Sequence, residues 1–242
     1  MASATQSSSS EGIKQYFVAA VATLATVGAV YQYAAIRYGA TGLSTLNKSL
    51  ATSTLFLLGL VLLLGPLCRM FARFDRWLKF RKELGVLTFY TGAAHVYLSM
   101  FVLARRGPWG LYLSSPWSAY PGLIAFIIMF LLLFISLRAV ETALGTKLWW
   151  KLQYLGARAA FFLIAFHMTV LKYSGWGSWF ATRGAEIQVG VPSLPPLAIL
   201  AAEFSVFVFL VRLSELFGQS LAQRMIQASF LAMLGFTVWL FF

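Results

Sequence analysis

The segment that decides the fold of this chain is Glu83–Ala104, with the sequence ELGVLTFYTGAAHVYLSMFVLA. After Glu83 it contains no Asp, Glu, Lys or Arg, and its length matches the roughly 20 apolar residues that a transmembrane helix needs. His95 lies near its middle. An ionisable side chain at that depth in a membrane is costly and marks a functional site by default. The segment therefore predicts a membrane helix built around a histidine.

The composition is that of a chain whose main solvent is lipid. Hydrophobic residues make up 60% of the 242 residues and charged residues 11%, and the mean hydropathy is +0.78. A soluble domain needs a charged surface, so this balance excludes the water-soluble α/β and all-β classes. The net charge of +12 comes from basic residues beside apolar segments, where they set topology and meet anionic headgroups. We therefore expect contact with the lipid bilayer and no nucleic-acid partner.

Apolar segments of membrane-spanning length recur along the whole chain. Runs such as LFLLGLVLLLGPL (55–67) show no alternation of apolar and polar positions, so they predict helices and not barrel strands. The sequence predicts an all-α, polytopic membrane bundle of about seven transmembrane helices, at residues 14–36, 50–71, 84–104, 119–139, 152–173, 193–213 and 222–242. The Ser-rich start lacks the features of a signal peptide. We expect a disordered tail at 1–12 and a single transmembrane domain at 13–242.

Basic residues in the short connections predict the orientation of the bundle. The larger group falls on one side, at Lys14, Arg69, Arg73, Arg76, Lys79, Arg81, Lys82, Arg138, Lys147, Lys151, Arg212 and Arg224. The smaller group falls on the other side, at Arg37, Lys48, Arg105, Arg106, Lys172 and Arg183. This asymmetry predicts a multi-pass protein of the inner or plasma membrane with a cytoplasmic amino terminus, and "inner" and "outer" are used below in that sense.

The second of the two histidines, His167, lies in the predicted span 152–173, which runs in the same direction as the span that holds His95. At about 1.5 Å per residue, His95 lies roughly 18 Å from Glu83 and His167 roughly 22 Å from Leu152. Two imidazoles at one depth on parallel helices can ligate the two faces of one iron porphyrin. The alternative is that each histidine forms a hydrogen bond across a helix interface. Because Cys68 is the only cysteine, a Cys-x-x-Cys-His attachment for covalent haem is excluded.

The motifs that flank the histidines carry a family resemblance. In chain order they are Gly65-Pro66-Leu67-Cys68-Arg69, Arg81-Lys82-Glu83-Leu84-Gly85, Phe89, Tyr90, His95, Tyr120-Pro121-Gly122, Ser136, Leu144-Gly145, Trp150-Lys151-Leu152-Gln153 and His167. Over about residues 50–172 the chain resembles the ferric reductase-like transmembrane domain family, and within it the haem-binding membrane subunits that serve bacterial methionine-sulfoxide reductases. The resemblance implies that His95 and His167 are the axial ligands of a b-type haem. It also implies one-electron transfer by the transmembrane subunit of an oxidoreductase.

Two departures from the family pattern reduce the expected number of haems to one. Members commonly have another histidine near the start of the fifth span, where this chain has Gln153, a poor iron ligand. Members with two haems also have a histidine about 13–14 residues before His95, where Arg81 and Lys82 stand here. A quinone or a flavin near Gln153, or a redox partner subunit, could bridge the gap on the inner side. The basic connection 69–82 could dock an acidic electron donor, although topology signalling alone explains it.

Two further charged residues fall inside predicted spans, where buried charges usually pair. At about 1.5 Å per residue, Arg158 lies about 9 Å and Glu203 about 15 Å from the inner boundary, so we expect a direct or water-bridged pair. In the functional interpretation, Arg158 holds a haem propionate and Glu203 handles a proton or a quinone hydroxyl. In the structural interpretation, the two residues form only an ion pair.

The rival to a haem protein is a haem-free structural subunit or small transporter that retains the fold. No G-x-G-x-x-G or P-loop pattern occurs in the chain, so no dinucleotide or ATP domain is expected on it. No catalytic residue is predicted either. The flavin or terminal reductase component of the oxidoreductase would then belong to another chain.

Overall fold

The computed structural model describes residues 2–104, 110, 115–182 and 193–242, and every regular element in this part of the chain is helical. Seven helices are long and apolar enough to cross a membrane. They comprise α1 (Ala2–Tyr38), α2 (Leu43–Met70), α3 (Arg81–Tyr97) with the helical turns on both sides of it over Ala72–Val102, α5 (Pro116–Ile135), α7 (Thr146–Thr182), α8 (Leu197–Ser214) and α9 (Gln219–Phe241). The prediction of an all-α, polytopic membrane bundle is confirmed.

Short helical elements join or extend these spans. The 3₁₀ helix η1 (Ala72–Phe80) connects α2 to α3, and α6 (Arg138–Leu144) connects α5 to α7. Helix α3 continues directly into a π-helical turn, η2 (Leu98–Val102), that begins three residues after His95. This wide turn lies at the outer end of the predicted third span.

Helices α1, α2 and α7 extend well beyond the spans predicted from hydropathy, and α2 begins at Leu43 instead of residue 50. Helix α7 runs from Thr146 to Thr182, because aromatic and polar residues continue the helix on both sides of its apolar centre. Helix α1 begins at Ala2, so the segment expected to be a disordered tail continues the helix toward its amino-terminal end. The division into a tail and a domain, like the orientation in the membrane, stays a prediction.

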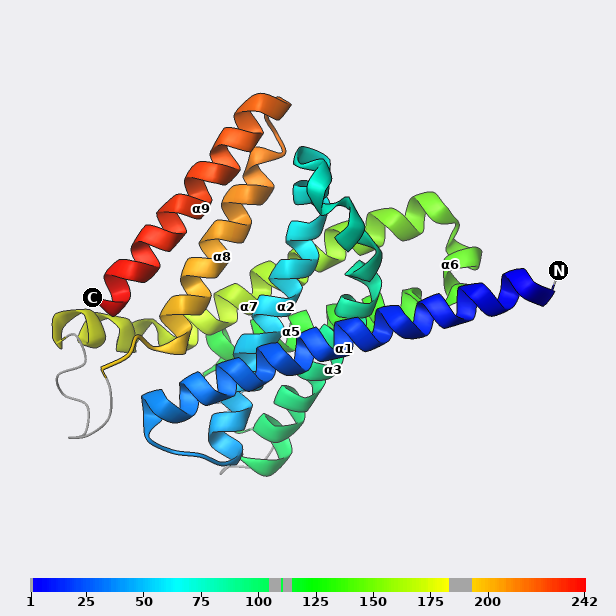
Figure 1. Cartoon of the computed structure of the whole chain (residues 1–242). Coiled ribbons are helices and arrows are strands. Elements are labelled where there is room, and N and C mark those ends of the chain that lie inside the picture. The colour runs from blue at the N-terminus through cyan, green and yellow to red at the C-terminus, as the bar shows by residue number, and fades with distance from the viewer. Residues whose placement is uncertain (1, 105–109, 111–114, 183–192) are drawn as a thin grey trace.

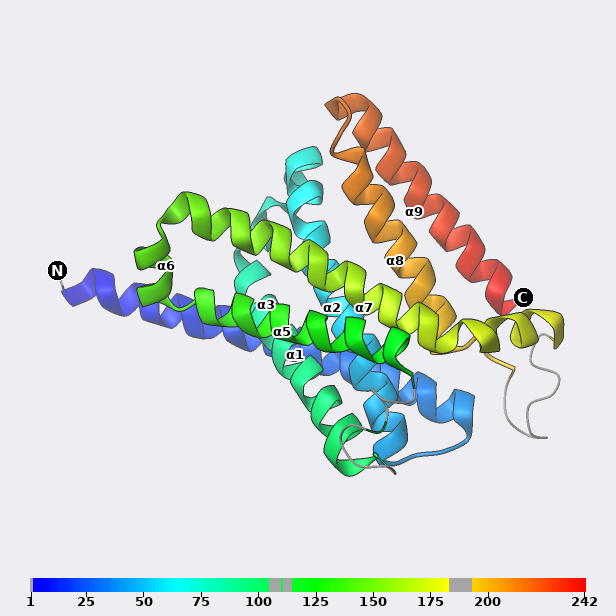
Figure 2. The same ribbon diagram turned by 180° about the vertical axis from the view of Figure 1, so that it is seen from behind.

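Helix α2 is central to the bundle (Figures 1 and 2). It packs against α1, α3, α7 and α8. Helices α5 and α7 lie side by side over most of the length of α5, and both views show them behind or in front of α2. Helices α8 and α9 form a hairpin on one side of the bundle, in contact with α2 through α8. This arrangement places α3 and α7 on two sides of a common space next to α2.

The core lies where α2 meets α7 and α8. Its buried side chains include Leu55, Leu58 and Leu62 of α2, Phe161 of α7 and Val208 of α8. The close approach of these helices depends on one small residue. A Cβ atom at Gly59 would lie 2.3 Å from a ring atom of Phe204 and 3.2 Å from one of Phe161. The exposed surface around the bundle carries many large apolar side chains, as the lipid environment requires.

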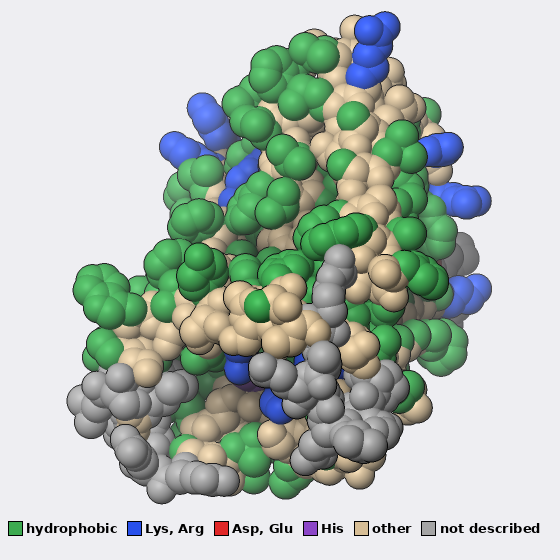
Figure 3. All heavy atoms as spheres, turned by 90° about the vertical axis from the view of Figure 1, so that its left-hand side faces the viewer, with side chains coloured by type: hydrophobic (Ala, Val, Ile, Leu, Met, Phe, Trp, Pro, Cys, Tyr) green, Lys and Arg blue, Asp and Glu red, His purple; other side chains and the backbone are tan. Residues whose placement is uncertain are grey.

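Figure 3 shows the outer end of the molecule, with hydrophobic side chains over most of the described surface. Basic side chains are visible inside a hollow in the lower part of this face. The candidate site lies in this hollow.

Candidate functional site

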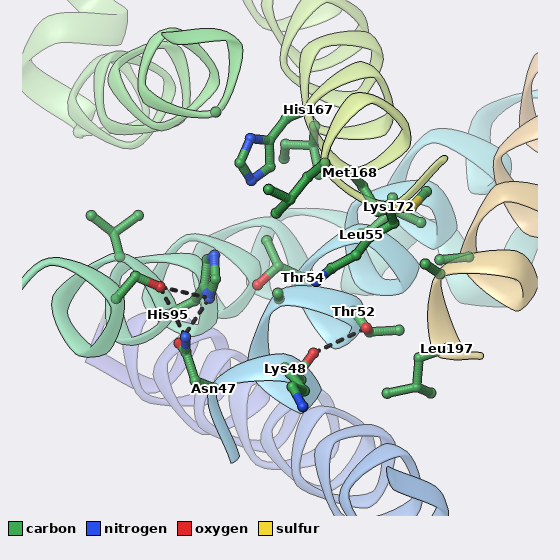
Figure 4. Close-up of a pocket in the computed structure, with 18 of the residues that line it drawn as sticks. Asn47, Lys48, Thr52, Thr54, Leu55, His95, His167, Met168, Lys172 and Leu197 are labelled. Atoms are coloured by element: carbon green, nitrogen blue, oxygen red, sulfur yellow. Dashed lines mark hydrogen bonds between the residues drawn. The ribbon is translucent and has the colours of Figure 1, made fainter. Parts of the chain in front are cut away.

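A cavity of about 780 Å³ opens among α1, α2, α3, α5, α7 and α8, and both histidines of the chain line it. Its volume falls within the range of roughly 300–1,000 Å³ that is usual for cofactor pockets. Figure 4 shows the two imidazoles in this space, His95 from α3 and His167 from α7. The structure thus brings together the two residues that depth counting paired, although their role as metal ligands stays a prediction.

The ring of His95 is held by a polar side chain of α2. Its Nδ1 atom lies 2.9 Å from Oδ1 of Asn47, and Nδ2 of Asn47 donates a hydrogen bond of 2.9 Å to Oγ of Ser99. Since the amide oxygen can only accept, Nδ1 of His95 carries the hydrogen in this arrangement. The lone pair of the ring then resides on Nε2, which is free to bind a ligand.

The ring of His167 is held by the backbone of α5. Its Nδ1 atom donates to the carbonyl oxygen of Ser118 in the first turn of that helix. The approach is possible because residue 122 is glycine. A Cβ atom at Gly122 would lie 2.9 Å from Nδ1 of His167 and 3.1 Å from its Cε1. Close packing of α5 on α7 therefore fixes the position of the ring.

Both histidines share the hydrogen-bonding pattern of metal-binding imidazoles. In such sites one ring nitrogen donates to an acceptor of the protein, which fixes the tautomer and aims the other nitrogen at the metal. The acceptors here are Oδ1 of Asn47 and the carbonyl oxygen of Ser118. Among the described residues, no group of three or more His, Cys, Asp and Glu side chains could hold a metal ion. Two imidazoles alone suit a metal that brings its remaining ligands with it, as in a porphyrin.

The walls between the two histidines suit a flat apolar group. Side chains such as Leu55, Leu123, Phe126, Ile164 and Met168 line them. Gly92 faces the cavity where a Cβ atom would come within 3.2 Å of Thr54 Cγ2. The glycine therefore allows α3 to pack closely against α2 beside the cavity.

Arg158 lies away from this cavity and has other partners. Its Nη2 atom is 3.1 Å from Oε2 of Glu215, and its guanidinium carbon lies 3.1 Å from the centroid of the Tyr154 ring. The expected pair with Glu203 is wrong, because Oε1 of Glu203 accepts a hydrogen bond of 2.7 Å from Thr237 of α9. Depth counting ignored the rotation of each side chain about its helix axis, and Glu203 faces α9. The proposed contact of Arg158 with a propionate gains no support from this placement.

Glu215 instead forms the centre of an ion-pair network at the inner end of the bundle. Arg69, Arg158 and Arg212 all contact its carboxylate, whose side chain is 12% exposed. The network joins the ends of α2 and α8 to α7. The network has a structural role, and we call it the clamp below. The structural interpretation of Arg158 predicted such an ion pair, but with Glu203 as the partner instead of Glu215.

Gln153 also has a structural role in the described part of the chain. Its Nε2 atom donates to Oγ of Ser136 at 2.7 Å and to the carbonyl oxygen of Leu132 at 3.1 Å. These bonds join α7 to the end of α5. Gln153 does not line the cavity, and a quinone or flavin beside it stays a prediction.

Sequence reasoning missed Asn47 and Arg37, which also line the cavity. Asn47 lay outside the predicted span 50–71, whereas α2 begins at Leu43. Arg37 was counted only as an outer topology signal. One signal could have identified Asn47. It is a polar residue one turn after the start of a helix, and it lies at the depth of a histidine on a neighbouring helix.

Comparison with known proteins gives one family. The family described as "Ferric reductase like transmembrane component" matches residues 50–165. No curated protein matches the chain. The matched region begins within α2, includes His95 and ends two residues before His167. Helices α1, α8 and α9 lie outside it.

Proposed function

We propose that this chain binds one b-type haem between His95 and His167, because residues 50–165 match the ferric reductase-like transmembrane component family, which implies membrane electron transfer. In this proposal the chain is the transmembrane subunit of an oxidoreductase. The observation that carries it is the pair of anchored imidazoles on one membrane-embedded cavity.

The protein's residues would act by positioning and shielding. Haem b, when bound, supplies a one-electron iron couple whose potential depends on its axial ligands and surroundings. Asn47 and the Ser118 carbonyl hold the two imidazoles in one tautomer, with both Nε2 atoms available as ligands. Occupation of both axial positions favours electron transfer over oxygen binding. The apolar walls between the rings would shield a bound haem from water.

A single haem is supported by the surroundings of the residues that replace further histidines. Gln153 is engaged with α5 through two hydrogen bonds. Arg81 lies close enough to Arg158 and Glu215 to interact with them electrostatically. Gln153 and Arg81 thus interact with residues of neighbouring elements, and neither is a histidine that could bind a second iron. The proposal therefore contains one haem per chain.

The redox partner is proposed to be a separate subunit. In the finer version of the proposal, which rests on the motifs of residues 50–172, it is a flavin-dependent donor or a terminal reductase of the methionine-sulfoxide type. Basic side chains of η1, among them Arg73, Arg76 and Lys79, offer a charged surface at the inner end for an acidic partner. A quinone or flavin that connects the haem to that side belongs to the same proposal.

A pyridine haemochrome assay on the purified full chain tests the proposed function. We expect about one b-type haem per chain and a low-spin spectrum. His95→Ala and His167→Ala should each abolish that spectrum, whereas Lys147→Ala on the inner side should leave it unchanged. A colourless wild-type protein that also takes up no added haem would refute the proposal and favour the haem-free alternative.

A further inference from the structure

We propose that the outer end of the cavity binds the two propionate carboxylates of the haem, through Arg37, Lys48 and Lys172. The haem would then stand with its propionate edge toward the outer face. This inference rests on the proposed haem and adds its orientation, which neither the histidines nor the family match defines.

The first argument is the charge of the cavity. Arg37, Lys48 and Lys172 line it, and none of its described lining residues is an Asp or Glu. Three like charges on one cavity within a membrane repel one another strongly, because the surrounding dielectric is low. An anionic ligand removes this repulsion. A group with two carboxylates offsets two of the three charges.

The second argument is the burial of Arg37 at the end of α1. Its side chain is buried, with 9% of the residue exposed, and its Nε atom has no hydrogen-bond partner among the described residues. A buried guanidinium with unused donors is costly unless an acceptor is supplied. Guanidinium groups match carboxylates in geometry and charge. The missing acceptor is therefore best explained as a carboxylate of the ligand.

Trp176 repeats this pattern on another wall of the cavity. Its Nε1 atom is buried without a hydrogen-bond partner among the described residues, and the residue lines the same space. It follows Lys172 by four positions on α7, so the two side chains are neighbours on one helix face. Lys172 in turn lies five residues, or about 7.5 Å, outward from His167. A cation and an N–H donor thus stand beyond the ligand histidine on the outer side.

Lys48 connects the cationic end of the cavity to the other histidine. It directly follows Asn47, the residue that holds His95. Its Nζ atom lies 4.1 Å from the ring centroid of Tyr38, and the Arg37 guanidinium lies 5.6 Å from the same centroid. Contact with the same aromatic ring lowers the cost of holding the two cations near each other. One turn of α2 therefore positions both an axial ligand and a cation.

A single ligand explains both ends of the cavity. The anchored imidazoles suit a metal with open axial positions, and the cations suit carboxylates on the same molecule. Haem b has both. At the inner end, the competing cation Arg158 is already paired with Glu215.

The test compares haem b with its dimethyl ester, in which both carboxylates are blocked. Each is titrated into the purified full-length apo-protein in detergent, and the dissociation constant is measured from the absorbance of the bound form. We expect wild-type protein to bind haem b at least about tenfold more tightly than the ester. Arg37→Gln and Lys172→Gln should each reduce this preference. Lys172 is exposed, so its variant should fold even where loss of Arg37 disturbs the bundle.

Arg158→Gln is the matched control, and it should keep the preference of the wild type. Equal affinity of wild-type protein for haem b and the ester would overturn the inference while leaving the bis-histidine site intact. Loss of the preference in Arg158→Gln, with no change in Arg37→Gln and Lys172→Gln, would overturn it as well and place the propionates inward. Failure of wild-type protein to bind either compound would instead refute the proposed function.

Discussion

The amide oxygen of Asn47 lies 2.9 Å from Nδ1 of His95, which joins the first turns of α2 to the last turn of α3. The same amide donates to Ser99, so one side chain orients both Ser99 and His95. With the amide oxygen facing Nδ1, His95 is in the tautomer that leaves Nε2 unprotonated.

We expect Asn47→Ala to weaken haem binding by about 10- to 100-fold, as is usual when the acceptor behind a metal-bound histidine is removed. Asn47→Asp should instead retain haem and lower its midpoint potential, because a carboxylate makes the imidazole a stronger electron donor. Haem titration and redox potentiometry measure the two effects. Thr52→Ala, at another position on the cavity wall, is the control. Equal affinities for all variants would show that Asn47 does not position the ligand.

Gly122→Ala should displace the ring of His167, since the added Cβ atom would lie 2.9 Å from its Nδ1. We expect a loss of the low-spin spectrum or a marked fall in haem content in the purified variant. Gly85→Ala on α3 meets no atom within 4 Å and serves as the control. An unchanged spectrum in Gly122→Ala would contradict the close approach of α5 to the histidine.

Glu215→Gln should destabilise the bundle, because it leaves three guanidinium groups around a neutral amide. Two of the three arginine side chains are largely buried, and Arg69 is 56% exposed. We expect a loss of about 2–4 kcal/mol in the free energy of unfolding, measured by denaturation in a detergent mixture. Glu11→Gln breaks only the exposed pair with Lys79 at 3.8 Å, and its effect should stay below about 1 kcal/mol. A similar effect of both variants would argue against the clamp.

The partner of Arg158 can be identified by double-mutant cycles. We expect Arg158→Gln and Glu215→Gln to be strongly coupled, with an interaction of roughly 1–3 kcal/mol. Arg158→Gln and Glu203→Gln should be additive within about 0.5 kcal/mol. Coupling to Glu203 in place of Glu215 would restore the pairing that the sequence suggested and reject the observed one.

The fold was predictable because lipid imposes a simple rule on sequence. Apolar runs of sufficient length identify helices, and all seven were recognised in this way. Depth was predictable too, since the rise per residue is fixed, and this brought His95 and His167 together. The direction in which a side chain points around its helix was not predictable. Arg158 was therefore paired with Glu203 at a compatible depth, whereas its partner Glu215 lies just past the end of α8.

The parts of the site that hold the two histidines were harder to predict, because they come from connections and helix ends. Asn47 belongs to a helix that starts earlier than its apolar segment does. Ser118 contributes a backbone carbonyl, which leaves no trace in the side-chain pattern. The contact of Gly122 with His167 depends on the packing of α5 against α7, and this packing is set by many residues at once.

The π-helical turn Leu98–Val102 changes the shape of the third span where it borders the cavity. Such a turn is equivalent to one residue inserted into an α-helix. The turn is also the last one of this span, because Leu103 caps it and the helix ends there. Ser99 and Met100 of the turn and Leu103 and Ala104 after it all line the cavity. The extra residue therefore widens the helix where its backbone borders the cavity, one turn beyond His95.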